Sequence, residues 1–167
     1  MERLAKSHDR SEFDCGNPVL SDWLKGQAGQ FEERGLSRTY VLVGPGHPRV
    51  WGYYSISSCQ VRYEDLPPQN TKRLPRRASI PAALIGKLAV DRSLQGQGLG
   101  GALLVDALRR IRGLADVIGM RVIIVDAIDA EAEAFYRRHG FEPIIEHPGR
   151  LFLSIRSIQE LGDPLPT

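Results

Sequence analysis

The amino-acid sequence predicts a single α/β domain, in which a β-rich meander is followed by elements in the order β-α-β-α-β-β. The chain has 167 residues, of which 42% are hydrophobic and 25% are charged. This length and composition suit one ordered domain with one core. Short runs of β-branched and aromatic residues predict the strands, and apolar residues at a spacing of about 3.6 predict the helices. We therefore expect residues 1–167 to form one domain.

The N-terminal half is expected to contain a short strand near Leu4, a helical region and a hairpin. Asn17 can cap a helix and Pro18 is tolerated in a first helical turn, so a helix should begin there. Its apolar stripe comprises Val19, Leu20, Trp23, Leu24 and Ala28. Gly35 should close the helical region. Residues 39–43 and 50–56 are expected to pair as antiparallel strands, because the segment between them is rich in Gly and Pro.

The C-terminal half alternates strands with helices. We expect a turn-rich insertion loop over residues 64–81, a strand over 82–90 and a long amphipathic helix after a glycine cluster. The apolar face of that helix comprises Leu104, Ala107, Leu108, Ile111, Leu114, Ala115 and Ile118. Further strands are expected at residues 122–125, 141–145 and 151–155, with a helix over 130–139.

Composition and residue spacing exclude several classes of protein. Cys15 and Cys59 are far apart, so neither a disulfide framework nor a thiolate zinc site is expected. A role for Cys15 in packing is favoured over a nucleophilic role. The four histidines lack metal-ligand spacing, and we expect no metal. The sequence has no apolar run long enough to span a membrane, so a soluble, cytoplasmic protein is expected. A net charge of +2 does not decide whether the protein binds nucleic acid.

The most informative segment runs from a predicted strand through a glycine-rich turn into the long helix. Four glycines fall within six residues, at positions 96, 98, 100 and 101. Backbone N–H groups and the positive end of the helix dipole would converge there, which is the arrangement that binds a phosphate or pyrophosphate. Glycines suit this role because a Cβ would hold the ligand away from the backbone. The alternative is a flexible connection without a ligand.

A dinucleotide-binding fingerprint is the main competing interpretation of these glycines. Gly96, Gly98 and Gly101 match its G-x-G-x-x-G spacing, and Asp126 stands at the end of the next strand. In that fold, however, the strand runs almost directly into the first glycine near the start of the domain. Here residues 91–95 intervene and about half the chain precedes the motif, so this interpretation is disfavoured. The nucleotide-triphosphate loop is excluded because no Gly-Lys-Ser/Thr follows.

The segment resembles motif A of the GCN5-related N-acetyltransferases, Gln/Arg-x-x-Gly-x-Gly/Ala, which residues 95–100 match. Residues 132–141 resemble a second motif of that family, Ala-x-x-x-Tyr-x-x-x-Gly-Phe. The resemblance implies a mixed, largely antiparallel sheet of about six to seven strands flanked by about four helices, and acetyl-coenzyme A as cosubstrate. The cofactor-binding residues that it implies are Leu88, Ala89, Val90, Gln95, Gly96, Gln97, Gly98, Leu99, Gly100, Gly101, Asp129, Ala132 and Phe135. Asp129 is a departure, since many members carry Asn there.

A narrower resemblance links the chain to the acetyltransferase toxins of bacterial type II toxin–antitoxin systems. It rests on residues 13–16, 20–24, 35–41, 52–54 and 86–91. It implies acetylation of the α-amine of aminoacyl-tRNA, a block of translation, a ribbon-helix-helix antitoxin and a homodimer. Two alternatives remain: an N-acetyltransferase for a small-molecule or protein amine, and a non-catalytic coenzyme A-binding module.

Tyr136 is the candidate catalytic residue. A phenol with an ordinary pKa near 10 is protonated at neutral pH and can donate a proton to a departing thiolate, whose thiol pKa is about 8.5. The alternative is a core aromatic beside Phe135. The predicted strand over residues 82–90 carries no carboxylate that could serve as a base, and Lys87 is its only ionisable side chain. An α-amine, with a pKa of about 7.7–8.0, needs a base less than a lysine acceptor does.

Basic residues in the insertion loop are the candidate RNA-binding residues. Four cations fall within six residues of a Pro-bearing loop and could follow a phosphate backbone. The predicted set is Arg38, Lys72, Arg73, Arg76, Arg77 and Lys87. The alternative is a solvated loop.

Overall fold

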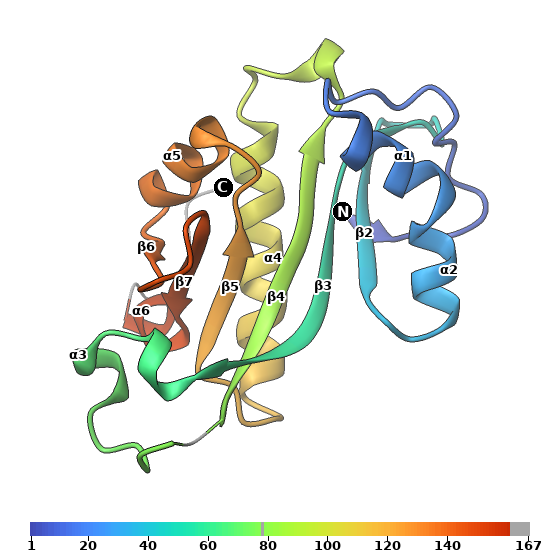
Figure 1. The fold of residues 1–167 in the computed structure, drawn as a ribbon. Coiled ribbons are helices and arrows are strands. Elements are labelled where there is room, and N and C mark those ends of the chain that lie inside the picture. Colours follow the sequence, from blue (N-terminus) through green and yellow to red (C-terminus); the bar gives the residue numbers. More distant parts are fainter. Residues whose placement is uncertain (78, 161–167) are drawn as a thin grey trace. The chain divides into compact units, whose positions relative to one another are not determined.

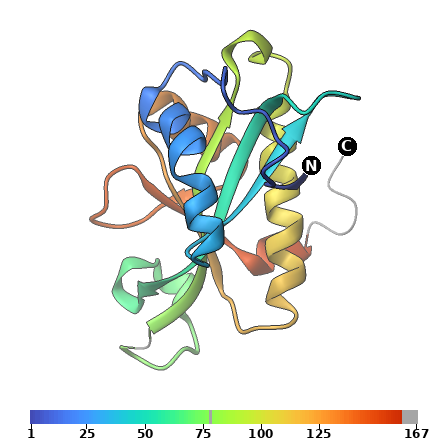
Figure 2. The same cartoon turned by 90° about the vertical axis from the view of Figure 1, so that its right-hand side faces the viewer.

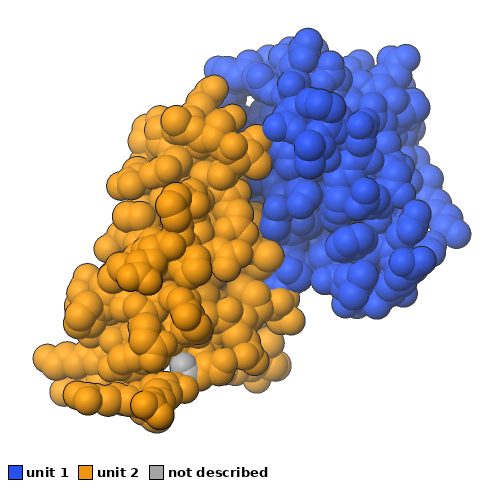
Figure 3. All heavy atoms as spheres, viewed as in Figure 1, with its two compact units in different colours: residues 1–57, 86–109, 167 blue, residues 58–85, 110–166 orange. Residues whose placement is uncertain are grey.

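The computed structural model describes residues 1–77 and 79–160, which contain seven strands and six α-helices. The chain divides into two compact units, coloured separately in Figure 3. Among the described residues, unit 1 comprises 1–57 and 86–109, and unit 2 comprises 58–77, 79–85 and 110–160. Strands β3 and β4 and helix α4 each contain residues of both units.

The strands follow the order β1-β2-β3-β4-β5-β7-β6 (Figure 1). β4 pairs with β5 in parallel, whereas β1 with β2, β2 with β3, β5 with β7 and β6 with β7 are antiparallel. The expectation of a mixed, largely antiparallel sheet is therefore confirmed. The strands are β1 Glu2–Arg3, β2 Arg38–Val43, β3 Val50–Arg62, β4 Ser79–Val90, β5 Val122–Asp126, β6 Glu142–Pro143 and β7 Arg150–Ser154.

In unit 1, helices α1 (Pro18–Gly26) and α2 (Ala28–Glu33) lie on one side of β2 and β3, and the first part of α4 (Leu99–Ala115) lies on the other (Figure 2). The predicted cap is confirmed, since the Asn17 side chain accepts a hydrogen bond from the Leu20 N–H. The core cluster here comprises Phe13, Leu20, Trp23, Leu24, Ala28, Val41, Val50, Tyr53 and Ala89. A Cβ at Gly52 would lie 2.9 Å from the Leu103 side chain, so this glycine lets α4 pack closely on β3.

Unit 2 has its own core beside the β4–β5 pair. It comprises Val61, Leu66, Ile80, Ala82, Val122, Ile124, Ile144 and Phe152. The pairing of β4 with β5 sets Ala82 opposite Val122 and Ile85 opposite Val125. The helices that belong wholly to this unit are α3 (Pro68–Thr71), α5 (Ala130–Arg138) and α6 (Ile155–Glu160).

Several sequence predictions are corrected by the structure. Val19 was predicted to lie on the apolar face of the first helix, but it is 70% exposed. It lies in the first turn of α1, outside the buried face of that helix. The region predicted as one helix is split at Gln27 into α1 and α2. α4 ends at Ala115, which leaves Leu114 and Ile118 about half exposed.

Other corrections concern short elements of unit 2. The predicted insertion loop contains α3 and the first residues of β4. The strand predicted over residues 141–145 is only two residues long, and α6 was not predicted. Within the described ranges, no helix has both the length and the apolar character needed to cross a membrane.

Candidate active site

The glycine-rich segment forms an exposed loop between β4 and α4. Gly96 and Gly98 adopt φ angles of +78° and +79°, a left-handed conformation that glycine adopts readily. A Cβ at either position would meet no atom within 4 Å, so the space beside the backbone is open. Gln95, Gly96, Gln97 and Gly98 are exposed. The segment is thus neither covered by protein atoms nor folded into the core of unit 1.

The start of α4 supplies hydrogen-bond donors next to this loop. The Ala102 N–H donates to the Gly98 carbonyl at 3.1 Å and so begins the helical pattern. The amides of the preceding helical residues, Leu99, Gly100 and Gly101, have no carbonyl one turn earlier in the helix. Together with the positive end of the helix dipole, they form a backbone site suited to a phosphate or pyrophosphate. Leu88, Ala89 and Val90 form the end of β4 that leads into it.

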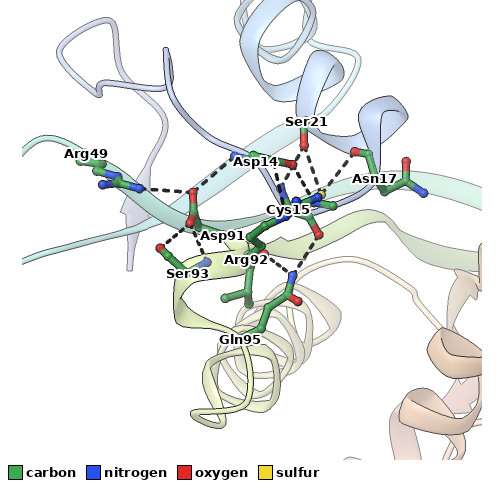
Figure 4. A network of polar contacts seen from close by, with 11 residues as sticks. Asp14, Cys15, Asn17, Ser21, Arg49, Asp91, Arg92, Ser93 and Gln95 are labelled. Carbon is green, nitrogen blue, oxygen red and sulfur yellow. Dashed lines mark hydrogen bonds and ion pairs between the residues drawn. The ribbon is translucent and has the colours of Figure 1, made fainter.

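The loop is fixed by a turn near the N-terminus, as Figure 4 shows. The Gln95 side-chain amide donates to the carbonyls of Cys15 and Val90, each at 2.9 Å. The Arg92 N–H donates to the Asp14 carbonyl at 2.7 Å. The side chain of Gln95 is therefore engaged with protein, and we expect its backbone rather than its amide group to face a ligand.

Asp91 anchors the start of the loop. Its buried carboxylate accepts hydrogen bonds from the Ser93 N–H at 3.0 Å, the Ser93 hydroxyl at 2.6 Å and the Asp14 N–H at 3.3 Å, and an Arg49 nitrogen lies 3.6 Å away (Figure 4). Burial opposes the charge, but these hydrogen bonds and Arg49 hold the pKa of Asp91 below its usual range. Asp91 thus remains ionised and ties the loop to the turn containing Asp14.

We expect Asp91→Asn to lower the thermal unfolding temperature at neutral pH. The two carboxylate oxygens accept from the Asp14 and Ser93 N–H groups, whereas an amide has only one acceptor oxygen. One buried N–H group is then left unpaired, which costs about 1–3 kcal/mol of stability. Because the pKa of Asp91 is lowered by folding, its stabilisation is present above the ordinary carboxyl pKa of about 3.9 and is lost as the pH falls through the lowered value. Thermal unfolding at neutral and acidic pH measures both effects.

Asp116→Asn is the control for that experiment, because Asp116 is exposed and forms no ion pair with the described residues. It should leave the unfolding temperature nearly unchanged. A difference between wild type and Asp91→Asn that stays constant down to the lowest pH would contradict the assigned role of the Asp91 charge.

Tyr136, on α5 in unit 2, is buried at 7% exposure. Its ring packs against Phe135 and Phe141, with centroid distances of 5.2 and 5.5 Å. Burial, with a smaller contribution from the Asp126 carboxylate, raises the pKa of Tyr136 to about 12. The phenol is therefore fully protonated at neutral pH.

The hydroxyl of Tyr136 differs from those of the other two buried tyrosines. Tyr53 donates to the Leu20 carbonyl at 2.7 Å, and Tyr54 donates to the Asp106 carboxylate. Among residues 1–77 and 79–160, the Tyr136 hydroxyl has no hydrogen-bond partner. Since buried tyrosine hydroxyls usually find a partner, this one is available to a bound molecule.

The other predicted cofactor residues of unit 2 lie at the start of α5. The Asp129 carboxylate caps this helix by accepting a hydrogen bond from the Ala132 N–H at 2.8 Å. Phe135 is half-buried between Tyr136 and His139. The capping function explains an acidic residue at position 129 without a ligand.

The predicted RNA-binding residues fall into two groups. Lys72, Arg73, Arg76 and Arg77 are exposed in unit 2, and none forms an ion pair with another residue that the structure describes. In unit 1, Arg38 binds Glu32 at 3.2 Å, and the Lys87 ammonium lies 5.5 Å from the centre of the Trp23 ring. Arg38 and Lys87 are thus engaged within the protein, whereas the four loop cations, which we call the basic loop, have no ion-pair partner in the described part of the chain.

The contacts of Asp14, Cys15 and Asp91 were missed by the sequence analysis. Asp14 and Asp91 are 77 positions apart, and no local pattern signals their contact. The one local signal is the Asp-Cys-Gly turn, in which the Asp14 carboxylate accepts from the Gly16 N–H at 2.8 Å and Gly16 adopts a φ of +88°.

The described residues contain no cluster of three or more His, Cys, Asp or Glu that could hold a metal ion.

This chain is an acetyltransferase of the GNAT family. The family's acetyltransferase (GNAT) domain matches residues 52–143, which include the glycine loop and Tyr136. Two curated relatives belong to a narrower class, the toxins. The chain is 38% identical over 162 residues to a tRNA-acetylating toxin of Mycobacterium tuberculosis, covering 96% of this chain and 95% of the relative. It is 36% identical over 161 residues to a probable toxin TacT of Sinorhizobium fredii, covering 92% and 89%.

Solved structures give the same result for the fold. A tyrosine-to-phenylalanine mutant of KacT has a TM-score of 0.90 at 33% identity, with 96% of each chain covered. AtaT complexed with acetyl-methionyl-tRNA has a TM-score of 0.90 at 30% identity, again with 96% of each chain covered. Other neighbours are AtaT–AtaR toxin–antitoxin complexes, one of them bound to acetyl-coenzyme A. The fold and family expected from the sequence are therefore confirmed.

Proposed function

We propose that this protein is a toxin that transfers the acetyl group of acetyl-coenzyme A to the α-amine of aminoacyl-tRNA and so blocks translation. The observation that carries the proposal is the exposed glycine loop at the N-terminus of α4, in a chain related over nearly its full length to a tRNA-acetylating toxin. The acetyltransferase activity belongs to the family as a whole, and the choice of acceptor rests on the relatives.

The residues of the loop fit the pyrophosphate of acetyl-coenzyme A. The open space at Gly96 and Gly98 is where a Cβ would stand in any other residue, so the ligand can approach the backbone. We assign the amides of residues 96–101 to the pyrophosphate, and the backbone of residues 88–90 to the acyl and pantetheine arm. The family resemblance also assigns Asp129, Ala132 and Phe135, at the start of α5, to the cofactor. When bound, acetyl-coenzyme A supplies an activated acetyl thioester.

We assign Tyr136 as the general acid. Its phenol oxygen holds a proton at every physiological pH, because burial raises its pKa to about 12. This hydroxyl is free of protein partners among the described residues, so it can donate the proton to the sulfur of the departing thiolate. The attacking amine releases one proton to water as the amide forms, and Tyr136 regains one from water, so the protons balance. A proton donor is needed because the thiol of coenzyme A, by analogy with cysteine, has a pKa of about 8.5.

The acceptor amine must be neutral to attack. The β4 strand contributes no carboxylate, and Lys87 packs over the Trp23 ring. An α-amine with a pKa of about 7.7–8.0 is partly neutral at physiological pH without a protein base. The absence of a base on β4 therefore supports an α-amine rather than a lysine as the acceptor.

The basic loop is proposed to bind tRNA through its phosphates. Lys72, Arg73, Arg76 and Arg77 are exposed and unpaired among the described residues, so they are available to an RNA backbone. We leave Arg38 and Lys87 as secondary candidates, because each already has a partner within unit 1.

We further propose a cytoplasmic protein that forms a homodimer and is neutralised by an antitoxin of the ribbon-helix-helix type. Support for an antitoxin comes from the AtaT–AtaR complexes and from the KacTA–DNA complex among the structural neighbours. The antitoxin type, the dimer and the cytoplasmic location are inferred from the narrower family resemblance.

The proposed function is tested by incubating the purified protein with acetyl-coenzyme A and charged tRNA. The expected products are acetyl-aminoacyl-tRNA and free coenzyme A thiol, and expression of the protein should arrest bacterial growth unless the gene beside it is co-expressed. Thiol release with small amines or peptides but not with charged tRNA would overturn the tRNA assignment. Coenzyme A binding without thiol release from any acceptor would overturn the enzyme assignment.

We expect tRNA affinity to depend strongly on salt. If the four cations of the basic loop each neutralise one phosphate, a fourfold rise in salt lowers the affinity by about 10²-fold. Replacing all four with Glu should remove tRNA binding and leave coenzyme A binding unchanged. Fluorescence anisotropy at several salt concentrations and calorimetry with coenzyme A make the two measurements. Salt-independent binding would contradict the role of the basic loop.

A further inference from the structure

A cavity of about 490 Å³ lies in unit 2 beside the basic loop. Its volume is within the usual range for small-molecule sites, about 300–1,000 Å³. Its lining includes the side chains of Tyr63, Glu64, Leu66, Arg76, Arg77 and Ile145. Only Arg76 and Arg77 of the basic loop line the cavity, whereas Lys72 and Arg73 do not.

The walls of the cavity combine an apolar part with charged groups. Tyr63 is half-buried against the core cluster of unit 2, Leu66 is buried and Ile145 is 49% exposed. Arg76 and Arg77 are exposed, and neither they nor Glu64 forms an ion pair with any residue in the described part of the chain. An aromatic ring beside two free guanidinium groups is a common arrangement for binding single-stranded RNA, because bases stack on aromatic rings and arginines bind phosphate.

Glu64 adds a means of distinguishing one base from another. Its carboxylate accepts hydrogen bonds but cannot donate them when ionised. Cytosine, adenine and guanine each carry an exocyclic amino group that donates to such a carboxylate, whereas uracil has none and presents a carbonyl oxygen where cytosine has its amino group. A carboxylate at the edge of the cavity therefore favours a base with an amino group over uracil.

We propose that this cavity binds one unpaired nucleotide of the RNA substrate, with an amino-bearing base such as cytosine against Tyr63 and Glu64 and its phosphate against Arg76 and Arg77. The inference rests on the proposed function, since it takes RNA to be the substrate. It goes beyond that function by assigning a base-selective site to residues that a purely electrostatic surface would not require.

Arg73 and Arg77 provide a matched pair of variants. Both are exposed arginines of the basic loop without ion pairs among the described residues, and both adopt a left-handed backbone, with φ of 71° and 65°. Arg→Ala therefore removes the same charge at either position and adds no backbone strain, because Arg and Ala both carry a Cβ. Only Arg77 lines the cavity.

The experiment measures binding of short fluorescein-labelled oligocytidylate and oligouridylate to the full chain by anisotropy. These probes avoid adenosine, which coenzyme A itself contains. We expect the wild type to prefer oligocytidylate, Arg77→Ala to lose about tenfold in affinity and Arg73→Ala only about twofold. Tyr63→Leu, which keeps an apolar group against the core, should lose about tenfold because base stacking is gone. Glu64→Gln should reduce the preference for oligocytidylate, because the neutral amide offers a donor as well as an acceptor.

Equal losses in Arg73→Ala and Arg77→Ala would overturn the proposal, because they would indicate binding by charge alone. Equal affinity of the wild type for the two oligonucleotides would also overturn it, and so would a loss of antitoxin binding in Arg77→Ala with RNA binding intact. The failure of the proposed function is seen separately. If charged tRNA is not acetylated but the oligocytidylate preference and its loss in Arg77→Ala are observed, the proposed function is wrong and the nucleotide site is supported. If charged tRNA is acetylated but Arg73→Ala and Arg77→Ala lose the same affinity, the nucleotide site is wrong and the proposed function is supported.

Discussion

Tyr136→Phe is expected to lower kcat about 10²–10⁴-fold, the usual contribution of a positioned acid, while the Kd for coenzyme A stays unchanged. The substitution removes only the hydroxyl and keeps the ring that packs between Phe135 and Phe141. The wild-type hydroxyl has no hydrogen bond to another described residue, so its removal leaves no buried group unpaired. Thiol release under saturating substrates measures kcat, and calorimetry measures coenzyme A binding.

Tyr53→Phe is the matched control. Tyr53 is also buried, but its hydroxyl donates to the Leu20 carbonyl at 2.7 Å in unit 1. Its loss should reduce the free energy of unfolding by about 1 kcal/mol and leave kcat nearly unchanged. If Tyr136→Phe turned over at the wild-type rate, or if both variants lost turnover equally, Tyr136 would be removed from the mechanism.

The pH dependence follows from the same assignment. The rate should rise with pH through the pKa of the acceptor α-amine, about 7.7–8.0, because the neutral amine is the nucleophile. A general acid loses activity only as the pH approaches its own pKa, and that of Tyr136 is raised to about 12. We therefore expect a plateau above the amine pKa and no falling limb at moderately alkaline pH. A fall near the ordinary tyrosine pKa of about 10 would contradict a buried, protonated Tyr136.

Local sequence patterns were sufficient for the elements with strong boundary signals. Asn17 and Pro18 predicted the start of α1, and Gly35 was expected after the helical region, where it adopts a φ of +69°. The continuous apolar run over residues 122–125 predicted β5, which extends one residue further. The shorter elements α3, α6 and β6 carry weaker signals, because a few residues cannot establish a helical or strand period.

In the candidate site, too, features set by neighbouring residues could be predicted, and contacts between distant residues could not. The glycine loop is defined by neighbours in sequence, so its exposure and its left-handed φ angles could be predicted. The side-chain partners of that loop could not, because Gln95 meets Cys15 across 80 positions of the chain. Arg38 shows a local contact that its charge alone did not predict. Its charge predicted RNA binding, which stays a prediction, and its ion pair with Glu32, six positions earlier, was not predicted.

Gly98→Ala is the prediction that tests the cofactor site most directly. The Cβ would project into the open space where we place the pyrophosphate, and would hold it away from the backbone amides. Losing about two hydrogen bonds to a charged group, each worth about 1.5–3 kcal/mol, lowers coenzyme A affinity by about 10²-fold or more. Calorimetric titration of the full chain with coenzyme A measures this without depending on turnover.

Gly46→Ala is the control that shows whether backbone strain alone could abolish coenzyme A binding. Gly46 lies between β2 and β3 and, like Gly98, has a positive φ (68° against 79°) and no atom within 4 Å of the place that a Cβ would occupy. An alanine in this conformation costs about 1–2 kcal/mol at either site. Both variants should therefore show a similar drop in unfolding temperature, but only Gly98→Ala should lose coenzyme A binding. Because the two substitutions share strain, size and exposure, a loss of binding in both would mean that strain acts on the whole unit, and retained binding in both would place the pyrophosphate elsewhere.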